Sequence, residues 1–289
     1  MNALFGPAGR DDSLNLLGYK TTLDIPRCMQ EKGLDAFEYQ CGRGVNVKTE
    51  VANELGALAR EKNIRLSLHA PYYISLSSVE AEKRDKSIDY IMQSAKAADA
   101  MGAGRIIVHS GSCSKISREY ALELAKDTLT RARKALDDNG LSHIIICPET
   151  MGKINQLGTL SEVMELCQID ERMIPCIDFG HLNARDLGII KGESEYAAIL
   201  DEVENKLGAD RVKIFHSHFS KIEYTAGGEK QHLTFEDEMF GPDYEPLMNQ
   251  IVKRGLAPTF ICESAGTQSD DALRMKQYYL KLKSGECIE

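Results

Sequence analysis

The sequence predicts an α/β protein built as one closed barrel of eight parallel strands, each followed by a helix. Eight short apolar runs alternate with longer segments that carry apolar residues at three- and four-residue spacing, the pattern of amphipathic helices. Near-continuous apolar strands between helices are typical of a parallel sheet covered by helices. Eight such units in about 250 residues are typical of the (β/α)8 TIM barrel.

The predicted strands are 2–6, 34–40, 64–69, 105–109, 143–149, 173–178, 212–218 and 258–263. The clearest helices are predicted over 84–102 and 117–140, and the second ends at a glycine, as helices often do. An open doubly wound sheet is the alternative, but its glycine-rich phosphate-binding motif is missing after the first strand, where the sequence reads FGPAGRDD. Because the chain has no Pro/Gly/Ser-rich linker, residues 1–289 are predicted to form one domain.

The composition is that of a globular protein, with 43% hydrophobic and 27% charged residues. The longest apolar runs, RIIVH and HIIIC, are far shorter than the roughly 20 residues of a membrane span. The N-terminus, MNALFGPAGRDD, lacks the basic start and apolar stretch of a secretory signal. We therefore expect a cytoplasmic protein with no membrane partner, and no pattern indicates an obligate protein partner.

The formal net charge of −9 argues against general nucleic-acid binding, because binding to the nucleic-acid backbone depends on Lys and Arg. Bound divalent metals would offset part of this charge. The eight cysteines form no C-x-x-C pair and have no regular spacing. Neither a disulfide framework nor a thiolate zinc site is predicted, and the thiols are expected to be reduced.

Side chains that can bind metals lie at the carboxyl ends of the predicted third to eighth strands. In a closed barrel these ends converge on one face, where this fold places its active sites. A single histidine or carboxylate at a strand end is usually a hydrogen-bonded structural residue or a helix N-cap. Several together without a metal would leave unsatisfied groups at a cost of about 1 to 3 kcal/mol each, so a divalent cation is the better interpretation. The residues are His69, His109, Glu149, Asp178, His181, His216 and Glu263.

Mixed imidazole and carboxylate ligands favour Zn²⁺, with Mn²⁺ or Fe(II) as alternatives. Seven candidates exceed the ligands of one tetrahedral ion, so at least two ions are predicted, with Glu149 or Glu263 as a bridge. His218 follows His216 by two residues and faces the same side of the strand, either as another ligand or as a group that orients one. We rank it below His216. His232 is either a surface residue or a ligand.

Several segments occur in the order expected of one protein family. They are LHAPYYISL (68–76), IIVHSGS (106–112), CPETMG (147–152), CIDFGHLNA (176–184), HSHFSK (216–221), GEKQH (228–232) and ICES (261–264). With them, the sequence resembles the endonuclease IV family of apurinic/apyrimidinic endonucleases over nearly its whole length. The resemblance implies a (β/α)8 barrel with a trinuclear zinc site that hydrolyses the DNA backbone on the 5′ side of abasic sites in base excision repair.

The resemblance also implies roles for individual residues. Tyr72, in the loop after the third strand, would engage DNA around the lesion. Glu149 and Glu263 would act in catalysis by orienting the nucleophile. The zinc ligands would be His69, His109 and Glu149 for one ion, Glu149, Asp178, His216 and Glu263 for a second, and His181 and His232 for the third.

Several positions depart from the family pattern. Lys230 stands where the family has an aspartate two residues before His232, and an ammonium group offers no lone pair to a metal. Either Glu229 replaces that aspartate or two ions suffice. His218 stands where the family usually has asparagine, and the first strand runs into residues 6–7 (GP), where the family commonly has a histidine.

Three functions remain open. The first is a metal-dependent phosphodiesterase acting on DNA with abasic sites, with Arg43 and Lys221 as phosphate contacts. The second is a sugar isomerase or epimerase that uses one divalent metal to polarise a carbonyl and carboxylates to move protons; Glu38, Lys230 and the acidic net charge fit it slightly better. The third is a barrel that binds nucleic acid or a small ligand without turnover. One ion per chain would favour the isomerase, and two or three would favour the nuclease.

Overall fold

The computed structural model describes residues 2–113 and 116–285 and confirms the predicted barrel. Eight parallel strands follow one another in the order β1-β10-β7-β6-β5-β4-β3-β2. β1 and β2 complete the ring through a parallel bridge between Ala8 and Glu38, and the Gly9 N–H donates to the Glu38 carbonyl over 2.9 Å. The strands are β1 (Leu4–Pro7), β2 (Ala36–Gln40), β3 (Arg65–His69), β4 (Arg105–His109), β5 (Ile145–Glu149), β6 (Cys176–Asp178), β7 (His216–Phe219) and β10 (Thr259–Cys262).

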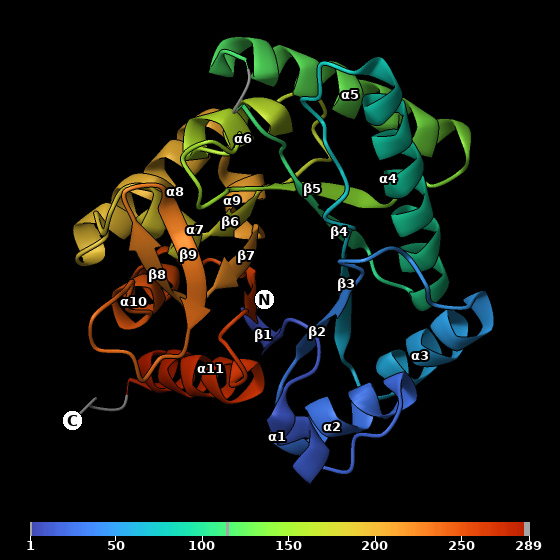
Figure 1. Cartoon of the computed structure of the whole chain (residues 1–289). Coiled ribbons are helices and arrows are strands. Elements are labelled where there is room, and N and C mark those ends of the chain that lie inside the picture. Colours follow the sequence, from blue (N-terminus) through green and yellow to red (C-terminus); the bar gives the residue numbers. More distant parts are fainter. Residues whose placement is uncertain (1, 114–115, 286–289) are drawn as a thin grey trace.

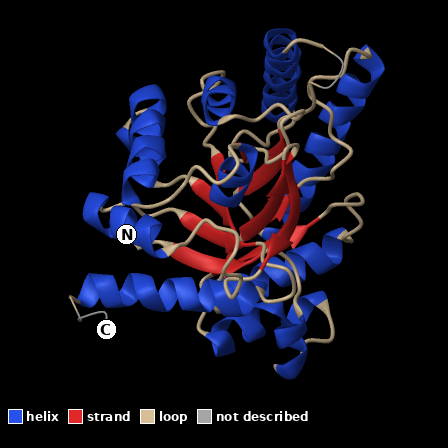
Figure 2. Cartoon of the chain, turned by 60° about the vertical axis from the view of Figure 1, so that its left-hand side comes forward, coloured by secondary structure: helices blue, strands red, loops and turns tan. Residues whose placement is uncertain are grey.

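Helices surround the ring of strands on its outside (Figures 1 and 2). The two helices predicted from the clearest periodicity are confirmed as α4 (Ala81–Met101) and α5 (Arg118–Asp138). Within the described ranges, no helix is both long and apolar enough to cross a membrane. The helices are α1 (Asp12–Leu16), α2 (Ile25–Lys32), α3 (Thr49–Glu61), α4 (Ala81–Met101), α5 (Arg118–Asp138), α6 (Leu160–Cys167), α7 (Phe179–Arg185), α8 (Glu193–Leu207), α9 (Ala209–Lys213), α10 (Glu245–Arg254) and α11 (Gln268–Ser284), with a 3₁₀ turn at Thr22–Asp24.

Most predicted strands begin one to three residues too early, as in β6, which starts at Cys176 and not at residue 173. Two segments differ more from the prediction. Residues 212–213, predicted as the start of a strand, belong to α9, and β7 begins only at His216, because a short apolar run fits a strand and a buried helical turn equally well. The segment around residues 227–232, for which no strand is predicted, is part of an antiparallel hairpin of β8 (Lys221–Thr225) and β9 (Gly228–Leu233). The hairpin packs beside α7, outside the ring of strands (Figure 1).

Side chains that point into the barrel form layers, since successive residues of a strand face opposite sides. On β4, Ile106 and Val108 belong to the large apolar cluster between strands and helices, whereas Ile107 packs with Cys147 and Cys176 in a small separate cluster. That small cluster lies on the inner side of β4, β5 and β6, below the barrel mouth. Two residues further along, the same three strands place their next inward-facing side chains at the barrel mouth: His109, Glu149 and Asp178.

The cysteines agree with the expectation of reduced thiols as far as the structure describes them. Seven described cysteines are free, and all but Cys113 are buried. Cys287 lies outside the described residues. A buried thiol in an apolar run packs as a small hydrophobic side chain.

Candidate metal centre

A pocket opens at the carboxyl ends of the strands, where the predicted ligands lie. Four groups of side chains bring potential ligand atoms within 4.8 Å of one another; three of them border this pocket and one lies deeper. The three are His69, Glu149 and His218; Glu149, Asp178, His218 and Glu263; and His181, Glu229 and His232; the deeper one is Cys176, His216 and His218.

Glu149, at the end of β5, lies at the centre of the site. Its Oε2 is 3.4 Å from the Nε2 atoms of both His69 and His109, and its Oε1 is 3.0 Å from Nδ1 of His218. Glu149 is 1% exposed, and its Oε2 accepts no hydrogen bond from any described residue. A buried carboxylate oxygen without a donor is unfavourable by about 1 to 3 kcal/mol. A cation between this oxygen and the two imidazoles would remove that cost.

Two histidines are held so that one particular ring nitrogen remains available. Nδ1 of His69 lies 2.8 Å from the carbonyl oxygen of Ala70, to which it donates, so the lone pair of its Nε2 faces the pocket. Nδ1 of His181 lies 2.9 Å from the carbonyl oxygen of Thr150, which leaves Nε2 facing Glu229 at 3.4 Å. Metal-binding histidines usually have such a second partner, which fixes tautomer and ring orientation.

Asp178 ends β6 and caps α7 at the same time. Its Oδ1 accepts a hydrogen bond from the His181 N–H over 2.8 Å, the usual N-cap arrangement. Its buried Oδ2 has no hydrogen-bond donor in the part of the chain that the structure describes. One carboxylate therefore starts the helix and keeps an oxygen for a cation. The spacing of three residues places His181 in the first turn of that helix, beside the same pocket.

The strand register changes one predicted ligand. β6 and β7 pair Cys176 with His216 and Asp178 with His218. His216 therefore lies one inward-facing layer deeper than the barrel mouth, with its Nε2 2.9 Å from Glu38, and it belongs to none of the three groups at the pocket. A two-residue spacing shows which side of a strand a residue faces but not how deep in the barrel it lies, so the sequence alone does not distinguish the level of His216 from that of His218.

His218 lies where His216 was expected. Its Nδ1 is 3.0 Å from Oε1 of Glu149 and 3.6 Å from Oε1 of Glu263. Its other ring nitrogen, Nε2, is 2.9 Å from Glu38. His218 is thus the imidazole that joins two of the ligand groups at the mouth.

The hairpin supplies the third group through a β-bulge. The register of β8 and β9 shifts between Glu223 and Tyr224, so that Lys230 is the extra residue of the bulge. In a regular strand, residues three apart face opposite sides. The bulge turns Glu229 and His232 to the same side, toward α7.

Lys230 consequently points away from the pocket. Its side chain is 54% exposed and its Nζ lies 2.6 Å from Glu223. Glu229, considered from the sequence as a replacement for the family aspartate, lies with its Oε1 4.0 Å from Nε2 of His232. Lys230, which departs from the family pattern, therefore lies outside the third ligand group, whereas its neighbour Glu229 belongs to that group.

The rim of the pocket carries two of the three residues expected to contact substrate. The exposed Tyr72 stacks on His109 with ring centroids 5.2 Å apart, and Arg43 is exposed and lines the pocket. Lys221 is different, because its buried Nζ lies 2.6 Å from the Asp237 carbonyl and 2.9 Å from the Asp243 carboxylate. The expectation that Lys221 contacts phosphate is wrong, since its charge is used to hold the loop after β9.

Burial and neighbouring charges set the ionisation of the site. Burial lowers the pKa of His109 to about 3, so its imidazole is neutral at pH 7 and its lone pair is available. Burial raises the pKa of Glu263 above its ordinary value. Burial also opposes ionisation of Glu149, but the charge of His218 and the hydrogen bond that His218 donates outweigh it and hold the pKa of Glu149 well below its ordinary value. Glu149 is therefore the permanent anion, and Glu263 is the carboxylate that can hold a proton.

The sequence model of the xylose isomerase-like TIM barrel family matches residues 27–280. The chain belongs to this family. An uncharacterised protein of Methanocaldococcus jannaschii is 34% identical over 250 residues, which cover 86% of this chain and 89% of the relative. A protein named probable endonuclease 4 of Ureaplasma urealyticum is 26% identical over 243 residues, 80% of this chain and 76% of the relative. The resemblance to endonuclease IV proteins is thereby confirmed.

Solved structures of two other proteins share the fold of this xylose isomerase-like barrel. Endonuclease IV from Thermus thermophilus superposes with a TM-score of 0.69 at 17% identity, covering 96% of this chain and 99% of that chain. A D-tagatose 3-epimerase-like protein superposes with a TM-score of 0.72 at 18% identity, covering 98% of each chain. At these identities the likeness establishes the fold alone, so the choice between the two activities depends on the site.

Proposed function

We propose that the protein is a metal-dependent phosphodiesterase that hydrolyses the DNA backbone on the 5′ side of abasic sites. The observation that carries the proposal is the presence of three ligand groups around one pocket, two of which share Glu149 and His218. A nuclease of this kind needs two or three ions, whereas the isomerase alternative needs one. Similarity to relatives named probable endonuclease 4 supports the same choice.

The ions we propose are Zn²⁺, with Mn²⁺ as the alternative, because the donor set mixes imidazoles and carboxylates. Two buried carboxylate oxygens, one each on Glu149 and Asp178, have no hydrogen-bond donor among the described residues, which fits cations at these positions. Bound there, the ions would supply Lewis acidity for phosphodiester hydrolysis. For one ion the ligands would be His69 and Glu149, with His109 because its Nε2 lies as close to Glu149 Oε2 as that of His69, although His109 is in none of the four groups among the described residues. For the other two they would be Glu149, Asp178, His218 and Glu263, and His181, Glu229 and His232.

The protein groups would then bind and orient the reactants. Glu149 and Glu263 would orient the attacking water, and the Glu263 carboxylate, 3.6 Å from Nδ1 of His218 at the barrel mouth, would accept its proton. Tyr72, with a 58% exposed side chain, offers a flat surface on which a base or sugar at the lesion can stack. Arg43 supplies a positive charge for a flanking phosphate.

The test is cleavage of a duplex that carries one tetrahydrofuran analogue of an abasic site, by protein loaded with Zn²⁺ or Mn²⁺. We expect a single cut 5′ to the analogue that leaves a 3′ hydroxyl, and no cut in the matched undamaged duplex. Glu263→Gln should slow the cut by about 100-fold or more, the range for loss of a proton acceptor, while Lys230→Ala should leave the rate unchanged. A metal-loaded protein that leaves the analogue duplex intact would refute the proposal.

A sugar isomerase or epimerase is the second candidate. Glu149, Asp178, His218 and Glu263 alone form a four-ligand group that suits a single ion, and flanking carboxylates can move protons in enediol chemistry. This function predicts one ion per chain and exchange of a carbon-bound hydrogen of a ketose with solvent deuterium. Elemental analysis and proton NMR of ketoses incubated in deuterium oxide distinguish it from the nuclease.

A further inference from the structure

We infer that Glu38, beneath the pocket, is a positioning residue that fixes the ring and the tautomer of His218 and so prepares the ligands of the second ion. The inference rests on the proposed metal site. Glu38 lies on β2, which contributes no residue to any of the four ligand groups among the described residues. It is fully buried and does not line the pocket. Glu38 can therefore act on the ligands only through a side chain that it contacts, such as His218.

Glu38 is held by four donors. Oε1 lies 2.9 Å from Nε2 of His218 and accepts a hydrogen bond from Gln40 over 3.2 Å. Oε2 lies 2.9 Å from Nε2 of His216 and accepts one from Ser67 over 2.9 Å. Each oxygen thus has two partners, which satisfies a buried carboxylate without a cation. The same arrangement locks the carboxylate in place.

The consequence for His218 follows from the inventory of donors and acceptors. An ionised carboxylate only accepts hydrogen bonds, so Nε2 of His218 must carry the proton that Glu38 receives. Nδ1 points toward Glu149 at 3.0 Å and Glu263 at 3.6 Å. Without an ion, Nδ1 also donates to the Glu149 carboxylate; an ion held by Glu149 and Glu263 would replace that proton and leave Nε2 bound to Glu38. Histidine ligands commonly donate their other ring N–H to a carboxylate, and this partner sets both ring orientation and basicity. Glu38 meets that description for His218.

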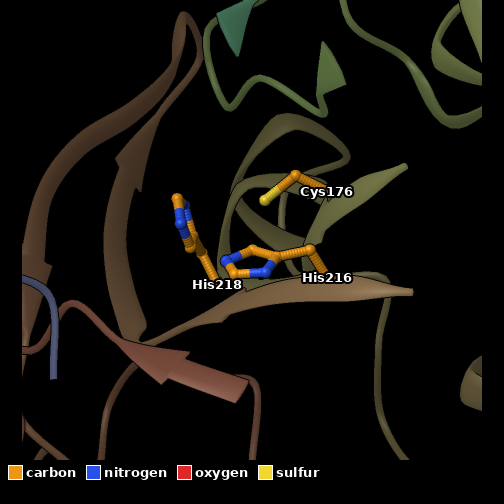
Figure 3. A group of neighbouring side chains, drawn as sticks. All are labelled: Cys176, His216 and His218. Atoms are coloured by element: carbon orange, nitrogen blue, oxygen red, sulfur yellow. The ribbon is translucent and has the colours of Figure 1, made fainter. Parts of the chain in front are cut away.

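The same contacts account for His216. Its Nε2 is committed to Glu38, and its Nδ1 is buried without a hydrogen-bond partner among the residues described. Figure 3 shows the sulfur of Cys176 directed toward the rings of His216 and His218, and these three form the deeper group. Glu38 occupies Nε2 of both imidazoles and Glu149 lies against Nδ1 of His218, so only Nδ1 of His216 and the Cys176 sulfur are left for an ion there. Neither Cys176 nor His216 lines the pocket. We therefore assign the deeper layer to support of His218, and an ion in that layer is an outcome of the test.

The experiment measures metal binding and the tautomer of His218 directly. Wild type, Glu38→Gln, Glu38→Ala and Cys176→Ser are freed of metal, reloaded with Zn²⁺ and titrated against a competing chelator, with the ions per chain counted. Nitrogen-15 NMR of labelled histidines in the zinc-loaded protein shows which ring nitrogen of His218 carries hydrogen. The His218 signals are assigned by their loss in His218→Gln.

We expect Zn²⁺ on Nδ1 and hydrogen on Nε2 of His218 in the wild type. Glu38→Ala should weaken one ion by about 10- to 100-fold, the range for loss of a group that orients a ligand. Glu38→Gln should weaken it less, because the amide oxygen can still accept from His218 while its nitrogen faces His216. Cys176→Ser, in the same layer, should keep the ion count and affinity of the wild type.

Three results would overturn the inference. Wild-type affinity in both Glu38 variants would show that Glu38 is dispensable. Zn²⁺ on Nε2 of His218 would contradict the assigned tautomer. Loss of an ion in Cys176→Ser would identify the deeper group as a metal site. Failure of the proposed nuclease is distinguishable, because protein that shows the expected binding and tautomer but leaves abasic DNA intact refutes the activity and leaves the role of Glu38 standing.

Discussion

Replacing Glu229 by glutamine tests whether the bulged hairpin supplies the third ligand group. The change keeps the size of the side chain but removes the negative charge of the Glu229 carboxylate, whose Oε2 lies 3.4 Å from Nε2 of His181. The group would then keep two imidazoles, His181 and His232, and lose its only carboxylate. Loss of groups that merely support a metal weakens binding by about 10- to 100-fold, so loss of a ligand should cost at least about 100-fold, or roughly 2.7 kcal/mol.

The assay is elemental analysis after dialysis against a weak chelator, together with a competition titration of Zn²⁺. Glu229→Gln should release one ion per chain while the others remain. Lys230→Ala should retain all of them, because the Lys230 side chain pairs with Glu223 on the far side of the hairpin.

A double variant makes the test sharper. In Glu229→Gln combined with Lys230→Asp, a carboxylate occupies the position that the endonuclease IV family uses, two residues before His232. The bulge directs residue 230 away from the pocket, so this carboxylate should not restore the lost ion. Restoration of the ion by the double variant would refute the assignment of the bulge, and an unchanged ion count in the single variant would refute the role of Glu229.

Three other perturbations probe the metals and the scaffold. A chelator should lower the thermal midpoint measured by circular dichroism by about 5 to 10 °C, since an ion present at 100 times its Kd stabilises the fold by about 2.7 kcal/mol; an unchanged midpoint would indicate that the folded chain holds no ion. A hydrogen bond from Arg172 lowers the pKa of Asp170 from 3.8 to about 2, so its stabilisation is present above pH 3.8 and is lost as pH falls through 2. Urea unfolding of Asp170→Asn should therefore show a deficit of at most about 1 kcal/mol at pH 7 that shrinks between pH 4 and pH 2, and a deficit that grows there would contradict the sign. Gly6→Ala should destabilise by about 3 kcal/mol or more in urea, because its Cβ would overlap the carbonyl oxygen of Ala36. Gly104→Ala should be tolerated, because its Cβ would have no described heavy atom within 4 Å.

The features that depend on local pattern could be predicted from the sequence. A short apolar run such as RIIVH predicts a buried strand without any knowledge of its neighbours in the fold, and β4 (Arg105–His109) has the predicted bounds. Polar residues at strand ends could also be predicted to meet, because a closed barrel brings all its carboxyl ends to one face. His69, His109 and Glu149 come together for this reason.

The features that depend on register between distant segments could not be predicted. Whether His216 or His218 is level with Asp178 is decided by the pairing of β6 with β7, which no local pattern reveals. The orientation of Glu229 depends on one extra residue in a hairpin that was not recognised, because two short polar strands give no hydrophobic alternation. The sequence does not show that the Lys221 side chain is already paired, because its partners Asp237 and Asp243 lie 16 and 22 residues further along the chain.

The hairpin also bears on how such a centre can change over evolutionary time. Two of the three members of one ligand group, Glu229 and His232, lie on β9, which makes no ladder hydrogen bonds with the eight-stranded ring. An insertion or deletion in the hairpin would rearrange the surroundings of a single cation and leave the hydrogen-bonded scaffold untouched. A barrel built in this way can gain or lose one metal ion, and the reaction step that the ion assists, while the packing of its core stays the same.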